Sequence, residues 1–275
     1  MYSHCLTLQR YQKVLELANR GIQIQQRRFK QYIPNMSLEY TKERAQELLQ
    51  KANAVKATVD KLSAGKARLV CVSKLKPASD IQALYDAGYR HFGENYVQEL
   101  TEKAQTLPKD INWHFIGGLQ TNKTKDLAKH IDNLYAVETI DTEKKARKLN
   151  STRVTVDKPK INVFIQVNTS GEEQKSGISP QETENLAKFI INECPRLHLQ
   201  GLMTIGSLSE SKSNGLNHDF EKLNEVRDGL QKDLNIELEL SMGMSSDYEE
   251  AIKQGATEVR VGSTIFGARP PRNGH

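Results

Sequence analysis

The chain has 275 residues, of which 37% are hydrophobic and 27% charged, and its net charge is +5 at pH 7. This length suits one large domain or two small ones, and no apolar run approaches the ~20 residues needed to span a membrane. The charge does not indicate a nucleic-acid groove, because removing the six basic residues and one acid of residues 1–36 leaves 33 basic and 33 acidic residues in 37–275.

Residues 1–36 form a basic extension that is rich in Gln and Arg. The composition resembles a mitochondrial targeting sequence, although serine is sparse, and an extension that joins no core is the alternative. Cys5, Cys71 and Cys194 are too scattered for a disulfide framework or a metal site. We therefore expect a cytoplasmic protein, or a mitochondrial one if the extension is a targeting signal, with its folded domain at 37–275.

A long helix is predicted over residues 38–63. Apolar residues recur there at alternating spacings of three and four, which is typical of a helix that packs one narrow face against a larger body. A coiled coil is the weaker interpretation, because the stripe is short and contains two alanines. The stripe consists of Ala45, Leu48, Ala52, Val55, Val59 and Leu62.

From residue 68 onward, strands and helices are predicted to alternate. The predicted strands cover 68–74, 89–95, 112–117, 133–138, 161–167, 197–205, 237–242 and 257–261. The helices between them cover 79–87, 96–106, 121–130, 141–152, 180–193, 216–234 and 246–254. Eight such units favour a closed (β/α)₈ barrel of the TIM type with parallel strands. An open doubly wound sheet is less favoured, because no Gly-x-Gly-x-x-Gly follows the first strand.

The first predicted strand delivers a lysine to its carboxyl end. An apolar run over 69–72 is followed by Ser73 and Lys74, and Pro77 stops the strand. Most lysines are solvated, but active sites of barrels lie at the carboxyl ends of the strands, so Lys74 is also a candidate reactive amine. Lys76, in the following loop, is its rival; Lys123 is a candidate for binding a substrate anion or a plain surface residue.

Other strand ends also carry polar groups and glycines. Barrels often bind phosphate between the loops after strands seven and eight, and serines with glycines occur at both: Met244–Asp247 and Gly262–Thr264. Alternatively, Ser246 or Asp247 serves only as a helix cap. His114, in the third strand, is either a general acid or a hydrogen-bonded core histidine.

The expected ligand follows from the neighbours of Lys74. Barrel closure places the first strand beside the eighth, where Arg260 alternates with Gly262 and shares its face. A lysine, an arginine and a phosphate site suggest pyridoxal 5′-phosphate held as a Schiff base, with Arg260 facing the ring nitrogen. The predicted cofactor-binding set is Lys74, Asn95, Met203, Ser245, Arg260, Gly262 and Ser263.

The sequence resembles the pyridoxal phosphate homeostasis protein family, whose barrel is similar to that of alanine racemase and other fold-type III enzymes. The resemblance rests on VSKLKP (72–77), FGENYVQEL (92–100), WHFIGGLQTNK (113–123), GLMTIG (201–206), LSMGMSSDYEEAI (240–252) and VRVGSTIFGAR (259–269). It implies that Lys74 carries the cofactor, that Ser245, Gly262 and Ser263 lie near its phosphate, and that Arg260 lies near its ring nitrogen. Leu75 and Ser263 stand where many members have Thr.

The resemblance implies a carrier or regulator of the free cofactor, without an established reaction and with transient transfer to apoenzymes. The chain stops within ten residues of Gly267, so we expect no β domain to supply a second acid/base, and we expect a monomer. An amino-acid racemase that uses Lys74 as base is the alternative. A cofactor-free barrel aldolase with Lys74 as its Schiff base is a third hypothesis.

Overall fold

The computed structural model describes residues 37–172, 175–207, 209–212 and 215–268. The predictions for the extension at 1–36, including its targeting role, and for Cys5 lie outside the described residues. None of the described helices is long and apolar enough to cross a membrane.

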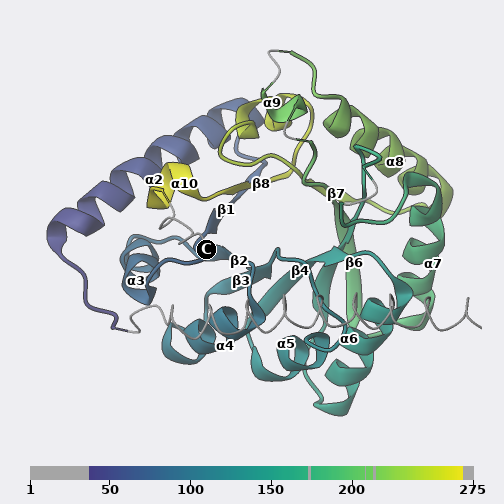
Figure 1. The fold of residues 1–275 in the computed structure, drawn as a ribbon, viewed down its shortest axis with the longest axis horizontal. Coiled ribbons are helices and arrows are strands. Elements are labelled where there is room, and N and C mark those ends of the chain that lie inside the picture. The colour runs from purple at the N-terminus through teal and green to yellow at the C-terminus, as the bar shows by residue number, and fades with distance from the viewer. Residues whose placement is uncertain (1–36, 173–174, 208, 213–214, 269–275) are drawn as a thin grey trace, which may run out of the picture.

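Eight parallel strands form a closed barrel in the order β1 to β8, and β8 returns to pair with β1 (Figure 1). The predicted barrel is therefore confirmed. The strands are β1 (Arg68–Val72), β2 (His91–Glu94), β3 (Asn112–Phe115), β4 (Leu134–Ile140), β5 (Ile161–Gln166), β6 (Leu197–Met203), β7 (Glu239–Ser241) and β8 (Glu258–Val261).

The helices lie around the outside of the strand ring in Figure 1. They are α2 (Lys42–Ser63), α3 (Ala78–Asp86), α4 (Val97–Thr106), α5 (Thr124–His130), α6 (Glu143–Thr155), α7 (Thr183–Glu193), α8 (His218–Leu234), α9 (Tyr248–Lys253) and α10 (Ser263–Phe266). Two short 3₁₀ turns cover Pro180–Glu182 and Glu210–Lys212. Every predicted element is present, and the ends differ by a few residues, because residues at several predicted ends turn into loops.

Helix α2 begins after Thr41, whose side chain accepts a hydrogen bond from the amide of Arg44. Its predicted stripe packs inward: Leu48, Ala52, Val55 and Val59 are buried, and the two outer members of the stripe pack against the core. The helix therefore covers one side of the barrel, where it contacts α3, α9 and α10.

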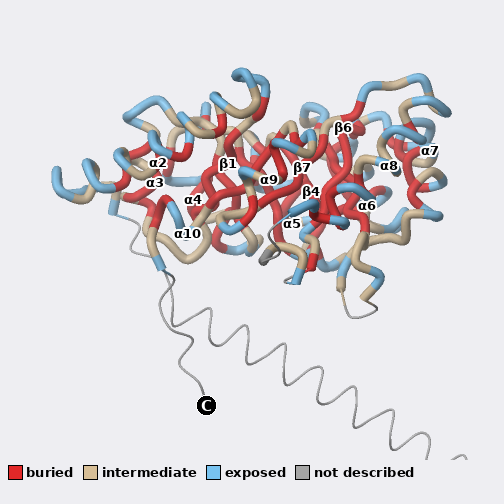
Figure 2. The backbone as a smooth tube through the Cα atoms, turned by 90° about the horizontal axis from the view of Figure 1, so that it is seen from above, coloured by how far each residue is buried: buried red, intermediate tan, exposed pale blue. Residues whose placement is uncertain are grey.

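The strand faces divide the interior into two regions. Outward-facing apolar side chains join those of the helices in one large core, seen as the buried centre of Figure 2. Inside the barrel, Phe164 and Met203 form a small apolar cluster with Ala136. Register pairs Arg68 with Glu258 and Val70 with Arg260. Charged side chains of β1 and β8 therefore lie next to one another on this side of the barrel.

Candidate functional site

Lys74 lies in a tight turn that starts where β1 ends. The turn is closed by the amide of Lys76, which donates to the carbonyl of Ser73 over 3.1 Å. Its third residue, Leu75, has φ +60°, a conformation that glycine adopts more readily than leucine. The predicted strand ended at Lys74, but the structure ends it at Val72, so half-buried Lys74 belongs to the mouth of the barrel.

The two predicted phosphate loops meet. The amide of Gly262 donates to Ser245 Oγ over 3.1 Å, which joins the loop after β7 to the end of β8. A Cβ on Gly262 would lie 3.3 Å from Val72 Cβ, so this junction also lies beside the end of β1. Ser263 is exposed at the start of α10. The sequence-predicted residues at these three strand ends are thus neighbours.

Asp247 accepts a hydrogen bond from the amide of Met244 over 2.7 Å. Its side chain therefore braces the turn before α9 and makes no capping hydrogen bond to that helix. Ser246 is exposed in the same turn.

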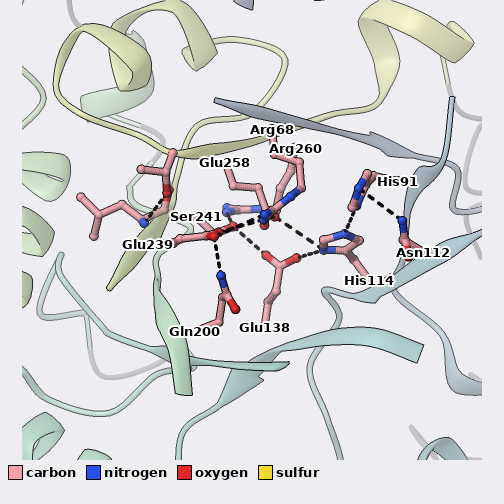
Figure 3. A network of polar contacts seen from close by, with 12 residues as sticks. Arg68, His91, Asn112, His114, Glu138, Gln200, Glu239, Ser241, Glu258 and Arg260 are labelled. Atoms are coloured by element: carbon pink, nitrogen blue, oxygen red, sulfur yellow. Dashed lines mark hydrogen bonds and ion pairs between the residues drawn. The ribbon is translucent and has the colours of Figure 1, made fainter. Parts of the chain in front are cut away.

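Arg260 points into the barrel from β8 and is buried. Its guanidinium donates to Ser241 Oγ over 2.6 Å and to the carbonyl of Thr204 over 2.8 Å. Figure 3 shows this side chain in a polar network with Ser241, Glu138 and His114. The predicted inward direction of Arg260 is thus confirmed, while its contact with a ring nitrogen stays a prediction.

The network continues from Arg260 through Ser241 to a buried histidine. Ser241 Oγ donates to Glu138 Oε2 over 2.6 Å, and Glu138 Oε1 lies 2.8 Å from His114 Nδ1. His114 Nε2 lies 2.9 Å from His91 Nδ1 (Figure 3). Of the two interpretations of His114, the structure favours a hydrogen-bonded core histidine.

Two arginines supply the positive charge that the lumen carboxylates require. Arg68 contacts Glu258 at 2.7 Å and Glu239 at 2.8 Å. Burial and the charge of Glu138 raise the pKa of Glu258. Burial also works to raise the pKa of Glu138, but hydrogen bonding from His114 and the charge of Arg260 outweigh it, and the net shift is downward.

His114, Glu138 and Glu258 place one ligand-type atom each within 4.8 Å of one another. These three groups already bond to each other or to Ser241 and Arg68.

Burial, with a smaller contribution from His114, lowers the pKa of His91 to about 4, so the histidine at the far end of the network stays neutral.

The remaining predicted residues occupy different settings. Asn95 follows β2 directly, and its Oδ1 is buried without a hydrogen-bond partner among the described residues. A bound group with a hydroxyl or N–H donor at this point would satisfy it, so this residue fits a polar ligand. Met203 ends β6 and is fully buried in the lumen cluster.

The rival lysines lie apart from the strand-end junction. Lys76 Nζ donates to the carbonyl of Ala268 over 2.8 Å. Lys123 Nζ lies 3.7 Å from Asp126 Oδ2 in a pair whose side chains are more than two-fifths exposed. The choice of Lys74 over these two lysines as the cofactor-binding residue stays a prediction.

A second charged cluster was not predicted from the sequence. Lys103 on α4 is fully buried and contacts Glu99 Oε1 and Glu94 Oε1, each at 2.7 Å. The available signal was the spacing of Glu99 and Lys103, which places both on the face of α4 that also carries Leu100 and Ala104. Charged residues next to the apolar face of a helix usually lie at its solvent-exposed edge. Glu99 and Lys103 are instead buried together with the apolar residues of that face.

Comparisons with known proteins give consistent results. A family model described as alanine racemase, N-terminal domain, matches residues 46–270. The pyridoxal phosphate homeostasis protein of Schizosaccharomyces pombe is 54% identical over 202 residues, covering 74% of this chain and 84% of that protein. The human protein of the same name is 48% identical over 211 residues, covering 74% and 76%. PipY of Synechococcus elongatus, solved with PLP bound, has a TM-score of 0.67 and 29% identity, covering 80% and 100%.

Proposed function

Because the chain belongs to the pyridoxal phosphate homeostasis protein family, with a barrel of the alanine racemase N-terminal type, we propose that it binds pyridoxal 5′-phosphate through Lys74. The observation that carries the proposal is the junction of three strand ends, where Lys74 follows β1 and the Gly262 amide meets Ser245 Oγ. PipY, solved with the cofactor bound, supports it.

Each residue of the site has a separate role in this proposal. Lys74 would hold the cofactor through its amine, for which the cofactor would supply an aldehyde carbon, with release of one water. Ser245 and Ser263 would offer hydroxyl donors for the phosphate, and the Gly262 amide, which donates to Ser245 Oγ in this structure, could join them. Arg260 lies deeper in the barrel and would be the residue near the ring nitrogen, to which it could donate a hydrogen bond but which it could not protonate.

Borohydride reduction of the cofactor-loaded protein, followed by peptide mapping, tests the assignment. We expect the reduced adduct on Lys74 and its loss in the Lys74→Ala variant. Lys76→Ala and Lys123→Ala are matched controls that should retain the adduct. An adduct on either of those two lysines would place the site elsewhere, and absence of any adduct in the wild type would contradict cofactor binding through an amine.

We further propose that the protein is a non-catalytic carrier that hands the cofactor to apoenzymes. The names of the relatives, which describe homeostasis, support this role. Cofactor-loaded protein should restore the activity of a pyridoxal-phosphate-dependent apoenzyme in the presence of a scavenger of the free cofactor. Failure to do so would contradict direct transfer, and sustained racemisation of single L-amino acids, followed by chiral chromatography, would contradict the non-catalytic assignment.

A further inference from the structure

We propose that the buried cluster of Lys103, Glu99 and Glu94 is a positioning device that fixes the backbone on both sides of Lys74. This inference rests on the proposed function, because it concerns the aim of the Lys74 amine at the cofactor aldehyde. The three side chains lie behind the turn and act through its backbone, so none of them is assigned a contact with the cofactor.

Two peptide groups meet at Lys74 Cα, and the cluster binds an atom of each. The carbonyl of the first peptide, that of Ser73, accepts from Lys103 Nζ over 2.9 Å. The amide of the second peptide, that of Leu75, donates to Glu99 Oε1 over 2.7 Å. Lys103 and Glu99 are themselves 2.7 Å apart. One ion pair therefore holds both peptide planes on which the direction of the Lys74 side chain depends.

Glu94 extends the same hold to the end of β1. Its Oε1 accepts from Lys103 Nζ over 2.7 Å and from Ser73 Oγ over 2.6 Å. Ser73, Glu94, Glu99 and Lys103 are all fully buried. Hydrogen bonds between charged groups are strong when water is excluded. The cluster is thus stiffer than a solvated loop contact would be.

The turn needs this support because its conformation is unfavourable for its sequence. Leu75 has φ +60°, which costs a residue with a branched side chain on the order of 1 kcal/mol or more. In this conformation of the turn, the amide of Leu75 donates to Glu99 Oε1. Without the acceptor, the turn would relax and the Lys74 amine would move away from its productive direction.

The cluster also carries the cost of burying three charged groups, which a purely structural role leaves unexplained. Two carboxylates flank one ammonium group, and burial together with Glu94 raises the pKa of Glu99 to about 7. Oε2 of Glu94 and of Glu99 have no hydrogen-bond partner among the described residues. Replacing such a buried ionic group by apolar residues of similar volume is often neutral or stabilising. A role in positioning the Lys74 amine explains why an ionic cluster lies directly behind this residue.

The test compares two ligands that differ only in the group that reacts with an amine. Pyridoxal 5′-phosphate can form the Schiff base, whereas pyridoxine 5′-phosphate has an alcohol in place of the aldehyde and can only occupy the site. Lys103→Met should weaken binding of the first at least roughly tenfold, or ~1.4 kcal/mol. Binding of the second should change less than about twofold. Lys56→Met removes an exposed lysine that is also four residues from its acidic partner and serves as the control.

Glu99→Leu is the second variant, because it removes the acceptor of the Leu75 amide and leaves Glu94 and Lys103 as a neutral pair. Glu99→Leu should also lose affinity for pyridoxal 5′-phosphate but not for pyridoxine 5′-phosphate. If circular dichroism shows that Lys103→Met does not fold, Glu99→Leu alone tests the proposal. Unchanged binding of both ligands, or equal loss of both, would overturn the positioning role. Failure of the wild type to form an adduct on Lys74 would instead be a failure of the proposed function itself.

Discussion

At the scale of single residues, the mouth of the barrel depends on backbone atoms that approach one another closely. A Cβ on Gly117 would lie 2.0 Å from the carbonyl oxygen of Asn95, whereas a Cβ on the next residue, Gly118, would meet nothing within 4 Å. Adjacent glycines therefore differ completely in the space available to a side chain. Gly117 has to be glycine if Asn95 is to keep its position.

This contrast yields a prediction. Gly117→Ala should push Asn95 away from the mouth, destabilise the fold by roughly 1–3 kcal/mol, and weaken cofactor binding. Gly118→Ala should change the free energy of unfolding by less than about 0.5 kcal/mol. Urea unfolding and cofactor titration of the two variants make the comparison. If the two variants have the same free energy of unfolding and the same cofactor affinity, the backbone at Gly117 can move to accommodate a Cβ.

The residue scale also shows what a sequence can reveal of a site. Lys74 and Arg260 could be singled out as candidates because each is a charged residue near the carboxyl end of a predicted strand. Lys103 and Glu99 could not, because their burial depends on how α4 packs against β2 and β3. A helix surface pair and a buried pair have the same spacing. The unpaired Oδ1 of Asn95 is likewise a property of the assembled mouth.

At the scale of elements, helix α2 is hydrogen-bonded both to α3, which follows Lys74, and to α10, which follows β8. Arg44 on α2 makes a bidentate contact with Asp80 of α3, at 3.1 and 2.6 Å. The same guanidinium donates to the carbonyl of Phe266 in α10 over 3.1 Å. The hydrogen bonds that Arg44 donates to Asp80 raise the pKa of Arg44 despite its partial burial. Since α10 starts at Ser263, α2 supports the proposed phosphate loop from behind.

Arg44→Met should therefore destabilise the protein by about 1–3 kcal/mol, because it leaves Asp80 buried without its charged partner. Lys51→Met, which removes an exposed partner of Glu47 on the same helix, should cost less than about 0.5 kcal/mol. Denaturant unfolding of both variants measures the difference. If the two changes cost the same, the three-element contact adds nothing to stability.

The elements themselves were predictable because hydrophobic runs and turn residues alternate regularly. Their exact ends were not. The first strand was predicted to reach Lys74, and the structure ends it at Val72 because the backbone enters the strained turn at Ser73. Helix α10 was not predicted, since its four residues carry no periodic pattern.

At the scale of the whole molecule, the polar lumen couples stability to pH. His91 is held neutral, because burial lowers its pKa from 6.5 to about 4. A base whose pKa is depressed by folding contributes stability above the unfolded value and loses it as the pH falls toward the folded value. The contribution of His91 should therefore disappear between about pH 6.5 and about pH 4. Glu99, whose pKa is raised, acts in the opposite sense as the pH rises toward 7.

The two effects can be separated by a variant. The free energy of unfolding of His91→Gln should fall less than that of the wild type as the pH is lowered through this window. His218→Gln, at an exposed position on α8, is the control and should follow the wild type. Urea titrations at several pH values provide the data. Parallel curves for wild type and His91→Gln would mean that His91 does not stay neutral in the fold.

The closed pairing of β1 with β8 also has a consequence for biosynthesis. The ribosome releases β1 long before β8, and at ~5–20 residues per second the delay is on the order of tens of seconds. Throughout that interval one edge of β1 is unpaired, and Lys74 lacks the arginine and the Gly262 loop beside it. A nascent chain therefore cannot present the complete site, and capture of the cofactor has to await the last strand.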